Sequence, residues 1–383
     1  MRIVEVCPFF KPHVGGVESH VALVAAELAR RGHEVTVLTS LHDRTLPTEE
    51  RDPAGYRIVR TPILGTVLAT PLTLRIGGYL EKMAFDVVHL HYPPPLTSYF
   101  AARALRGRSD RVYLTYHCDL YLEGPIGGLL AALYQKMFLP QTLAVARRVI
   151  VHTESYASTS RYLTGISAHV IPSLVDTDHF HPMTEDPELR SRLGAEGKRI
   201  VLFVGRLVPH KGVDDLLRAV EMLPSDVLLV IVGGGPDLPL LQKEALDLGL
   251  SHRVVFAQGV PDDELPRYYA LATVVASPSQ NRLEGFGLAA VNAMACGRPV
   301  IVADMPGVRE VVENGVDGLL TEPLIPEDLA KKLSAILSDP GLLFEMGQKA
   351  RENAVRKYGV SVVVDQLEKL FQSDLAEDRA SRG

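Results

Sequence analysis

The chain has 383 residues, of which 46% are apolar and 22% are charged, and its formal net charge is −6. This length exceeds the size at which one hydrophobic core keeps growing, so we expect two domains. The cysteines Cys7, Cys118 and Cys296 show no CxxC spacing, which excludes a disulfide framework and a thiolate zinc site and indicates a reducing compartment. Residues 1–180 carry a charge of +2 and the rest −8, too little positive charge for a nucleic-acid partner.

The amino terminus carries Arg2 and Glu5 and has no basic segment leading into an apolar core. We therefore expect no secretory signal and a cytoplasmic protein. Residues 124–146 contain a single charge, Lys136, and are interrupted by glycine pairs and Pro140. They fit either a buried helix pair or a surface that touches a lipid acceptor or the inner face of a membrane. Four arginines could form a face for anionic headgroups, although such a run is more often a solvated helix end and loop: Arg103, Arg106, Arg108 and Arg111.

The first domain is predicted over residues 1–180. Residues 2–7 (RIVEVC) are predicted to form a short buried strand. After a Gly-Gly loop, apolar residues that share one helix face predict a helix, which ends at Gly32. Further strand-like runs follow, with helical material between them: HEVTVLTS, YRIVR, DVVHLH, RVYLTYH and RVIVHT. This βαβ rhythm predicts a Rossmann-like domain with a parallel sheet covered on both faces.

Residues 171–194 lack periodicity and are predicted to be the hinge. A second βαβ rhythm predicts a similar domain over 181–358, with the strands RIVLFVG, DVLLVIVGG, RVVFA, TVVASPS, RPVIVAD and GLLT. Residues 359–383 are expected to form a helix that crosses back to the first domain, followed by a frayed charged tail. The predicted fold class is α/β, with two facing, doubly wound domains and a ligand cleft at the carboxyl ends of both sheets.

Gly15 and Gly16 lie between the first strand and the first helix. Because they have no side chains, their backbone N–H groups and the helix amino terminus can approach an anion. A tight turn that needs positive φ explains two glycines equally well. This motif alone leaves both interpretations open.

The segment VGRLVPHKG at 204–212 follows the first strand of the second domain. Arg206 and Lys211 then stand at the carboxyl end of that strand, where both cations can reach a diphosphate. Each cation alone fits a solvated loop. The combination of strand, glycine, arginine and Lys-Gly before an amphipathic helix favours a phosphate site.

Residues 277–300 place Glu284 before Gly285, Phe286 and Gly287, which open a helix that Gly297 ends. This order offers free N–H groups to a phosphate and a carboxylate to sugar hydroxyls. The alternative is that Glu284 only caps the helix.

His117 ends a strand of the first domain in the sequence TYHCD. A histidine at a strand end is commonly a structural residue with satisfied hydrogen bonds. Since such a position faces the cleft, the functional interpretation is a hydrogen-bond partner for sugar hydroxyls.

Taken together, these motifs resemble glycosyltransferase family 4, the retaining sugar transferases of GT-B architecture. The resemblance spans the chain and rests on the order and spacing of GGVE at 15–18, the histidine of TYHCD, VGRL with Lys-Gly at 204–212, VGGGP at 232–236 and SPS with EGFG at 277–287. It implies that a hexosyl or N-acetylhexosaminyl group moves from a nucleotide-diphosphate sugar to a hydroxyl acceptor without a metal ion. The acceptor would be a sugar, a glycan or a lipid.

The resemblance also implies roles for single residues. Gly16, with Gly15 beside it, would approach the donor, and Arg206 and Lys211 would hold its diphosphate. Glu284 would bind sugar hydroxyls, and His117 would contact the transferred sugar, with its main-chain carbonyl on the reactive face. The other implied donor contacts are backbone N–H groups and a residue that flanks the nucleobase: Phe286, Gly287, Leu288 and Val260.

Two departures from the family pattern bear on the donor site and the hinge. Asn292 stands where the family places a second glutamate, so ribose binding would lack that charge. Ser173-Leu174 replaces the Asn-Gly of the hinge. Residues 176–178 spell the DxD that binds metal in the other glycosyltransferase architecture. We interpret them as hinge, because Arg206, Lys211 and a helix amino terminus can neutralise the leaving group.

Two other functions are weighed against a transferase. Asn292 raises the possibility of a non-catalytic protein that binds nucleotide sugars. A nicotinamide-dependent oxidoreductase would need GxGxxG after a strand and an acidic residue about 20 positions later. Neither predicted sheet begins in that way.

Overall fold

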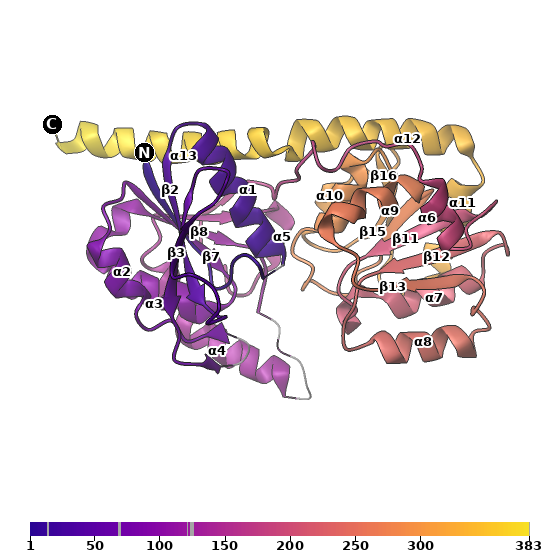
Figure 1. Ribbon diagram of the computed structural model, residues 1–383, viewed down its shortest axis with the longest axis horizontal. Coiled ribbons are helices and arrows are strands. Elements are labelled where there is room, and N and C mark those ends of the chain that lie inside the picture. Colours follow the sequence, from indigo (N-terminus) through magenta and orange to yellow (C-terminus); the bar gives the residue numbers. More distant parts are fainter. Residues whose placement is uncertain (14, 68–69, 121, 123–125, 383) are drawn as a thin grey trace. The chain divides into compact units, whose positions relative to one another are not determined.

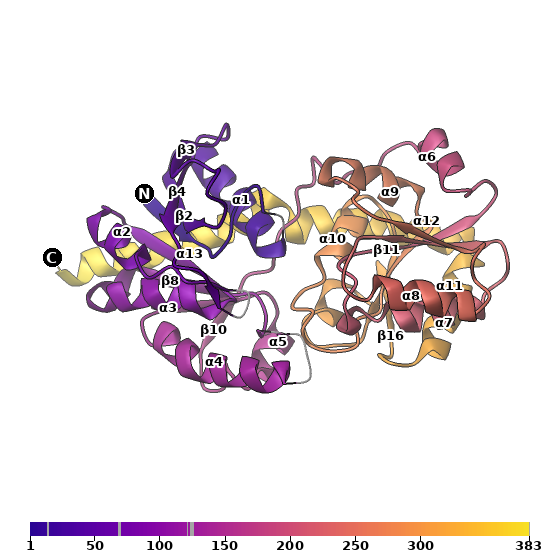
Figure 2. The same ribbon diagram turned by 60° about the horizontal axis from the view of Figure 1, so that its bottom comes forward.

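The computed structural model describes residues 1–13, 15–67, 70–120, 122 and 126–382. They form two compact units, the first built from Met1–Leu174 and Val360–Gly383 and the second from Val175–Gly359 (Figure 1). Each unit contains a parallel sheet with helices on both faces (Figure 2). The predicted fold class of two Rossmann-like domains is confirmed.

The first unit is built on an eight-stranded sheet with the order β10-β9-β8-β7-β1-β2-β4-β3. All neighbours pair in parallel except β3 and β4. The strands are β1 (Arg2–Val6), β2 (Glu34–Leu41), β3 (Glu49–Arg51), β4 (Arg57–Pro62), β7 (Val87–Tyr92), β8 (Val112–Tyr116), β9 (Arg148–Val151) and β10 (Ala168–Val170), with a small separate sheet of β5 (Thr66–Val67) and β6 (Thr70–Pro71).

Successive side chains of a strand point to opposite faces of the sheet, so the apolar strands give this sheet two apolar faces. On β1, Val4 and Val6 belong to one core cluster, whereas Ile3 and the following Cys7 belong to the other, as a period of two residues requires. The helices that cover these faces are α1 (Gly16–Arg30), α2 (Ile76–Lys82), α3 (Pro95–Ala104), α4 (Gly127–Leu143), α5 (Glu154–Thr159) and α13 (Val360–Arg382).

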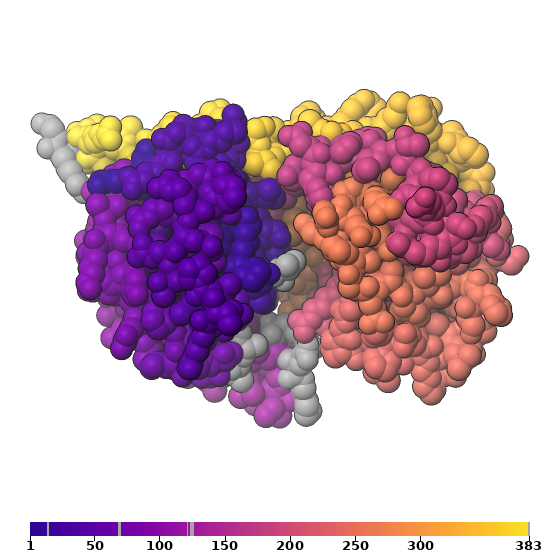
Figure 3. All heavy atoms as spheres, in the orientation of Figure 1, coloured from indigo at the N-terminus to yellow at the C-terminus, as the bar shows by residue number. Residues whose placement is uncertain are grey.

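The carboxyl-terminal helix α13 packs on the first unit, beside α1. Its apolar side chains join the core cluster that contains Val21 and Val24 of α1. The expected frayed tail is wrong, because the helix continues to Arg382. Figure 3 shows yellow atoms of this helix against those of the first unit. The buried Asp374 holds it there through ion pairs with Arg147 and Arg148, at 3.2 and 2.7 Å.

The second unit has a six-stranded, entirely parallel sheet in the order β13-β12-β11-β14-β15-β16. Numbered within the unit, this is the 3-2-1-4-5-6 order of a dinucleotide-binding fold. The strands are β11 (Arg199–Val204), β12 (Val227–Val232), β13 (Val254–Ala257), β14 (Val274–Ser277), β15 (Val300–Ala303) and β16 (Gly318–Thr321). The helices are α6 (Pro187–Arg192), α7 (Val213–Glu221), α8 (Leu238–Asp247), α9 (Leu265–Leu271), α10 (Leu288–Ala295), α11 (Pro326–Leu337) and α12 (Pro340–Asn353).

The apolar segment at 124–146 forms the single helix α4 rather than a helix pair; its residues 124 and 125 lie outside the described part of the chain. Pro140 lies inside this helix and lacks the N–H that would donate to the carbonyl of residue 136. Among the described helices, none combines the length and the apolarity that crossing a bilayer requires.

Candidate functional site

Two loops of the second unit lie against each other at the carboxyl ends of β11 and β12. The Gly205 N–H donates to the Val232 carbonyl at 3.0 Å, and the Leu207 N–H to the Gly234 carbonyl at 2.9 Å. A Cβ on Gly233 would lie 2.0 Å from the Gly205 carbonyl oxygen, so this approach requires glycine. The VGRL and VGGGP motifs are therefore one structural feature, and it places the exposed Arg206 at the strand ends.

Lys211 and Glu284 form an ion pair between the loop after β11 and the loop before α10. Their side chains are 20% and 12% exposed. Burial alone would raise the pKa of Glu284, but the Lys211 ammonium outweighs burial and holds this pKa below its ordinary value. The sequence left open whether Glu284 is only a helix cap. In the structure it meets the lysine of the other motif.

The amino end of α10 follows Gly287, whose φ of +87° lies in the left-handed region that favours glycine. The Gly287 N–H hydrogen-bonds the Glu284 carboxylate, so this carboxylate lies at the start of α10, next to Leu288. Phe286 anchors the same segment, because its buried ring packs against Tyr358 with centroids 5.5 Å apart. The second unit thus brings Lys211, Glu284 and the first turn of a helix to one place.

Asn292 and Val260 lie outside this convergence. Asn292 is half-buried on α10 and hydrogen-bonds the hydroxyl group of the buried Tyr269. Val260 follows β13 and packs, half-buried, against the core of the same unit. Their roles toward ribose and nucleobase stay predictions.

The Asp-Thr-Asp segment forms a local turn in the second unit. The Asp176 carboxylate accepts hydrogen bonds from the backbone N–H groups of Asp178 and His179, both at 3.0 Å. An Asx-type turn accounts for Asp176 without a ligand.

Gly15 and Gly16 begin α1 without the positive φ that a tight turn would need. Gly15 is extended, with φ of −172°, and a Cβ there would lie 2.3 Å from Oε2 of Glu18. Burial raises the pKa of Glu18, whose carboxylate also lies 3.2 Å from His13 Nδ1. Because Gly15 has no side chain, the Glu18 carboxylate has room to lie at the amino end of α1.

His117 directly follows β8, and its N–H donates to the Tyr92 carbonyl at 2.8 Å. Its Nε2 lies 3.0 Å from His91 Nδ1, and its Nδ1 lies 2.9 Å from His152 Nε2. Because both ring nitrogens already have a histidine neighbour, a sugar contact would fall to the main-chain carbonyl, the second role that the resemblance implies.

Polar residues that were not predicted from the sequence surround His117. They come from β1, α1, β7 and the end of β9, and they are Glu5, His20, His89, His91 and His152. Two signals were available: a carboxylate inside an apolar strand, and a His-x-His spacing that puts both rings on one face of a strand.

Comparisons with known proteins agree with this geometry. Residues 14–179 match the family described as Glycosyltransferase Family 4, and residues 185–355 match Glycosyl transferases group 1. The GDP-mannose-dependent alpha-(1-6)-phosphatidylinositol monomannoside mannosyltransferase of Mycolicibacterium smegmatis is 30% identical, over 90% of this chain and 92% of the relative. The D-inositol 3-phosphate glycosyltransferase of Acidothermus cellulolyticus is 31% identical, over 96% and 87%.

Solved structures share the architecture. Sucrose-phosphate synthase from Thermosynechococcus elongatus superposes with a TM-score of 0.79 and 23% identity, covering 98% of this chain and 99% of that one. HepE from Anabaena, in complex with UDP and glucose, gives 0.76 and 22%, covering 97% and 100%; at such identities the likeness establishes the fold alone. The family matches cover both units, and the relatives align along nearly the whole chain, so this chain belongs to glycosyltransferase family 4 and is a retaining glycosyltransferase with the GT-B fold.

Proposed function

We propose that the chain transfers a hexose from a nucleotide-diphosphate sugar, and that Arg206, Lys211 and the first turn of α10 hold the diphosphate. The ion pair of Lys211 with Glu284 carries this proposal. It puts a cation and a carboxylate at the strand ends where open α/β sheets bind ligands, next to a helix amino end that favours negative charge. Family membership leaves the oxidoreductase alternative without support.

Each partner of the ion pair has a separate role when a donor binds. Lys211 moves its hydrogen bond from Glu284 to the diphosphate and, with Arg206, stabilises the charge that develops as the leaving group departs. The Glu284 carboxylate then orients the sugar hydroxyls and favours positive character at the anomeric carbon. The acceptor hydroxyl attacks from the face that the diphosphate leaves.

We propose GDP-mannose as the donor and an inositol-phosphate group, carried on a lipid, as the acceptor. The names of both relatives contain an inositol phosphate or phosphatidylinositol group, and one of them names GDP-mannose. A surface of the first unit favours the lipid-linked form of such an acceptor over the soluble one.

That surface, the α4 stripe, consists of four apolar side chains on one side of α4 with exposed fractions of 51–73%: Ile126, Leu129, Leu133 and Met137. The spacing of three and four residues places them on one helix face. Lys136 is the one charge in α4, and Arg106 hydrogen-bonds Gln141 near its end at 3.2 Å. Apolar side chains flanked by cations match the chemistry of an anionic membrane surface.

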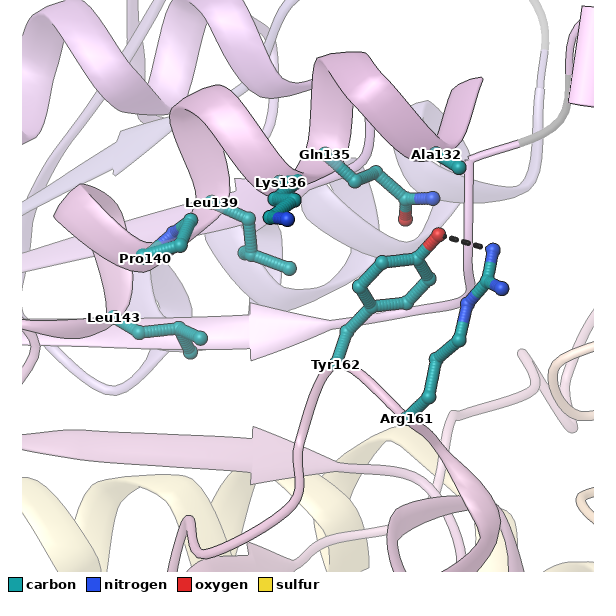
Figure 4. A pocket seen from close by; sticks show the side chains of 8 residues that line it. All are labelled: Ala132, Gln135, Lys136, Leu139, Pro140, Leu143, Arg161 and Tyr162. Carbon is teal, nitrogen blue, oxygen red and sulfur yellow. Dashed lines mark hydrogen bonds between the residues drawn. The ribbon is translucent and has the colours of Figure 1, made fainter. Parts of the chain in front are cut away.

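Other residues of α4 line a pocket of about 400 Å³ in which Leu139 and Leu143 supply apolar walls. Figure 4 shows Tyr162 pointing toward α4, with its hydroxyl accepting a hydrogen bond from Arg161 at 2.6 Å. Arg108 and Arg111 do not extend this basic surface, because both fold onto Phe85: one guanidinium lies 3.6 Å from the ring and the other donates to its carbonyl at 2.7 Å. Arg103 and Arg106 are the exposed members of the predicted basic face, and they hydrogen-bond Tyr99 and Gln141.

Transfer is tested by incubating the chain with GDP-mannose and phosphatidylinositol, with UDP- and ADP-sugars as parallel donors. We expect a mannosylated lipid whose anomeric configuration, determined by NMR, is that of the donor. An inverted product would contradict retention. Donor binding with neither transfer nor hydrolysis would instead support the non-catalytic alternative.

Membrane contact is tested by flotation with anionic phosphatidylinositol vesicles. Leu129→Glu should reduce binding, because it puts a negative charge in the α4 stripe. Leu240→Glu, on the comparably exposed Leu240 of α8, is the matched control. Equal flotation of the two variants would show that the stripe is not the contact surface.

We also propose that no metal ion acts on the donor diphosphate, because Arg206, Lys211 and α10 supply the positive potential. After removal of Mg²⁺ and Mn²⁺, activity should be unchanged when either ion is added back. A strict requirement for Mn²⁺ would reassign Asp176 and Asp178.

A further inference from the structure

A chain of polar contacts runs through the interior of the first unit, from a carboxylate to a main-chain carbonyl. Glu5 Oε2 lies 2.8 Å from His91 Nε2, and His91 Nδ1 lies 3.0 Å from His117 Nε2. His117 Nδ1 lies 2.9 Å from His152 Nε2, and His152 Nδ1 lies 3.1 Å from the carbonyl oxygen of Ile171. Glu5 and His91 are fully buried, and His152 is 5% exposed.

The Glu5 end determines which nitrogens carry hydrogen. Glu5 Oε2 lies 2.8 Å from His91 Nε2 and 2.9 Å from His89 Nδ1, and a carboxylate can only accept hydrogen bonds. His91 Nε2 is then the donor, which in neutral His91 leaves Nδ1 as an acceptor. His117 Nε2 must donate to it, so in neutral His117 the Nδ1 atom carries a lone pair.

The Ile171 end of this chain of contacts determines the other side of the contact between His117 and His152. The Ile171 carbonyl can only accept, so His152 Nδ1 is the donor. In neutral His152 the Nε2 atom therefore carries a lone pair as well. Two lone pairs then face each other across the 2.9 Å contact between His117 and His152, an arrangement that is repulsive unless a cation lies between them.

A third ring converges on this contact. His20, on α1, is 5% exposed, and one of its ring nitrogens lies within 4.8 Å of nitrogens from His117 and His152. The three rings therefore offer one nitrogen each around a single point inside the first unit.

We propose that His20, His117 and His152 bind a divalent transition-metal ion, with zinc as the natural candidate. Imidazole nitrogen is a preferred ligand of Zn²⁺, and three histidines with one further position make a common zinc site. Nitrogens that share a tetrahedral zinc ion lie about 3.3 Å apart, so the 2.9 Å contact opens slightly and His20 moves inward.

The outer hydrogen bonds of the three rings match those of a metal site. Metal-ligating histidines generally hold their other ring nitrogen against a carbonyl, carboxylate or hydroxyl. Here His152 is held by the Ile171 carbonyl, His117 by His91 and through it by Glu5, and His20 Nδ1 by the Ser173 hydroxyl at 3.2 Å. The ion would join α1 to the ends of β8 and β9 and fix the His117 segment. It goes beyond the transfer reaction, which needs no metal on the diphosphate.

The test measures metal content and stability rather than activity. The full chain, without an affinity tag, is stripped with a chelator, loaded with ZnCl₂ and desalted, and its zinc is measured by plasma mass spectrometry. We expect close to one equivalent of zinc and a higher melting temperature. CoCl₂ should give the visible absorption of a low-symmetry, nitrogen-ligated Co²⁺ ion.

Three variants separate a designed site from unspecific binding. His152→Asn should abolish zinc retention and the thermal shift, whereas His169→Asn, a histidine of β10 in the same unit, should change neither. Ser173→Ala keeps all three ligands and removes one outer hydrogen bond, so it should weaken zinc binding by about tenfold while the fold persists.

Two results would overturn the proposal. One is a loaded wild-type chain without zinc after desalting and without a thermal shift, which would mean that a shared proton closes the contact between His117 and His152. The other is equal zinc retention by wild type and His152→Asn, which would place the bound metal elsewhere. Because activity is not the readout, neither result bears on the transfer of sugar.

Discussion

Lys211 and Glu284 neutralise each other in the second unit, and a diphosphate would compete with the carboxylate for the ammonium group. We predict that Lys211→Ala and Arg206→Ala each weaken nucleoside-diphosphate binding. A charge-assisted hydrogen bond contributes about 1.5–3 kcal/mol, roughly a tenfold to hundredfold change in Kd. Titration calorimetry with GDP and UDP measures the effect.

Lys243→Ala is the matched control for this prediction. Lys243 is a 73% exposed lysine of α8 in an ion pair with Asp247, so its removal should leave Kd unchanged. If both site variants bind as tightly as this control, the phosphate site lies elsewhere.

Glu284 should matter for turnover more than for binding. We predict that Glu284→Gln lowers kcat by at least about tenfold while the Kd for free nucleoside diphosphate changes little. The amide keeps the shape but removes the charge that favours positive character at the anomeric carbon. Steady-state kinetics together with calorimetry make the comparison. A Kd that rises as much as kcat falls would assign Glu284 to diphosphate binding instead.

The pH dependence of the same residue has a defined sign. Because Lys211 holds the pKa of Glu284 below its ordinary value, the carboxylate stays ionised throughout the neutral and weakly acidic range. Protonation of Glu284 should therefore not produce a loss of kcat between about pH 5.5 and 8.

At the scale of elements, α13 is held on the first unit by apolar packing and by Asp374. This carboxylate is 1% exposed, accepts a hydrogen bond from Tyr113 at 3.1 Å and pairs with Arg147 and Arg148. We predict that Asp374→Asn destabilises the first unit by about 1–3 kcal/mol, measured by urea unfolding. Asp365→Asn, at a half-exposed position of the same helix, should stay within about 0.5 kcal/mol of wild type.

This contribution should depend on pH. Burial would raise the pKa of Asp374, but Arg148 and Tyr113 outweigh burial and lower it. The stabilisation is therefore present above the unfolded-state pKa of about 3.9 and is lost as pH falls through the lower folded-state value. The stability difference between wild type and Asp374→Asn should be constant from about pH 6 to 8 and shrink below about pH 4. A difference that is unchanged in acid would show that packing, rather than charge, holds the helix end.

At the scale of the whole molecule, the chain folds as two units with separate cores. Since we place the diphosphate on the second unit, a nucleoside diphosphate should raise the unfolding temperature of that unit. At 100 times its Kd, the ligand stabilises the unit to which it binds by about 2.7 kcal/mol. Differential scanning calorimetry should show two unfolding transitions, and the nucleotide should directly raise the midpoint temperature of one of them. An equal shift of both would mean that the two units unfold together.

Much of the fold follows from local patterns in the sequence. Near-continuous apolar runs such as those of β1 and β11 can be buried only in a sheet that is covered on both faces, and Gly32 ends α1 where the periodicity ends. The exceptions are segments whose structure depends on distant partners. Asp374 looks like part of a solvated tail in the sequence, and it is helical because Arg147 and Arg148 face it from another part of the chain.

In the candidate site, too, some features can be predicted from the sequence and others depend on distant partners. The sequence by itself determined the family and the motif residues Arg206, Lys211, Glu284 and His117, because chemistry and spacing are readable along the chain. Only the tertiary structure decided that Lys211 pairs with Glu284 across 73 residues, and that Glu5 and four further histidines gather around His117. The physical reason is that parallel strands bring their ends together in the order of the sheet, not of the sequence, so contacts between strand ends are fixed only when the sheet forms.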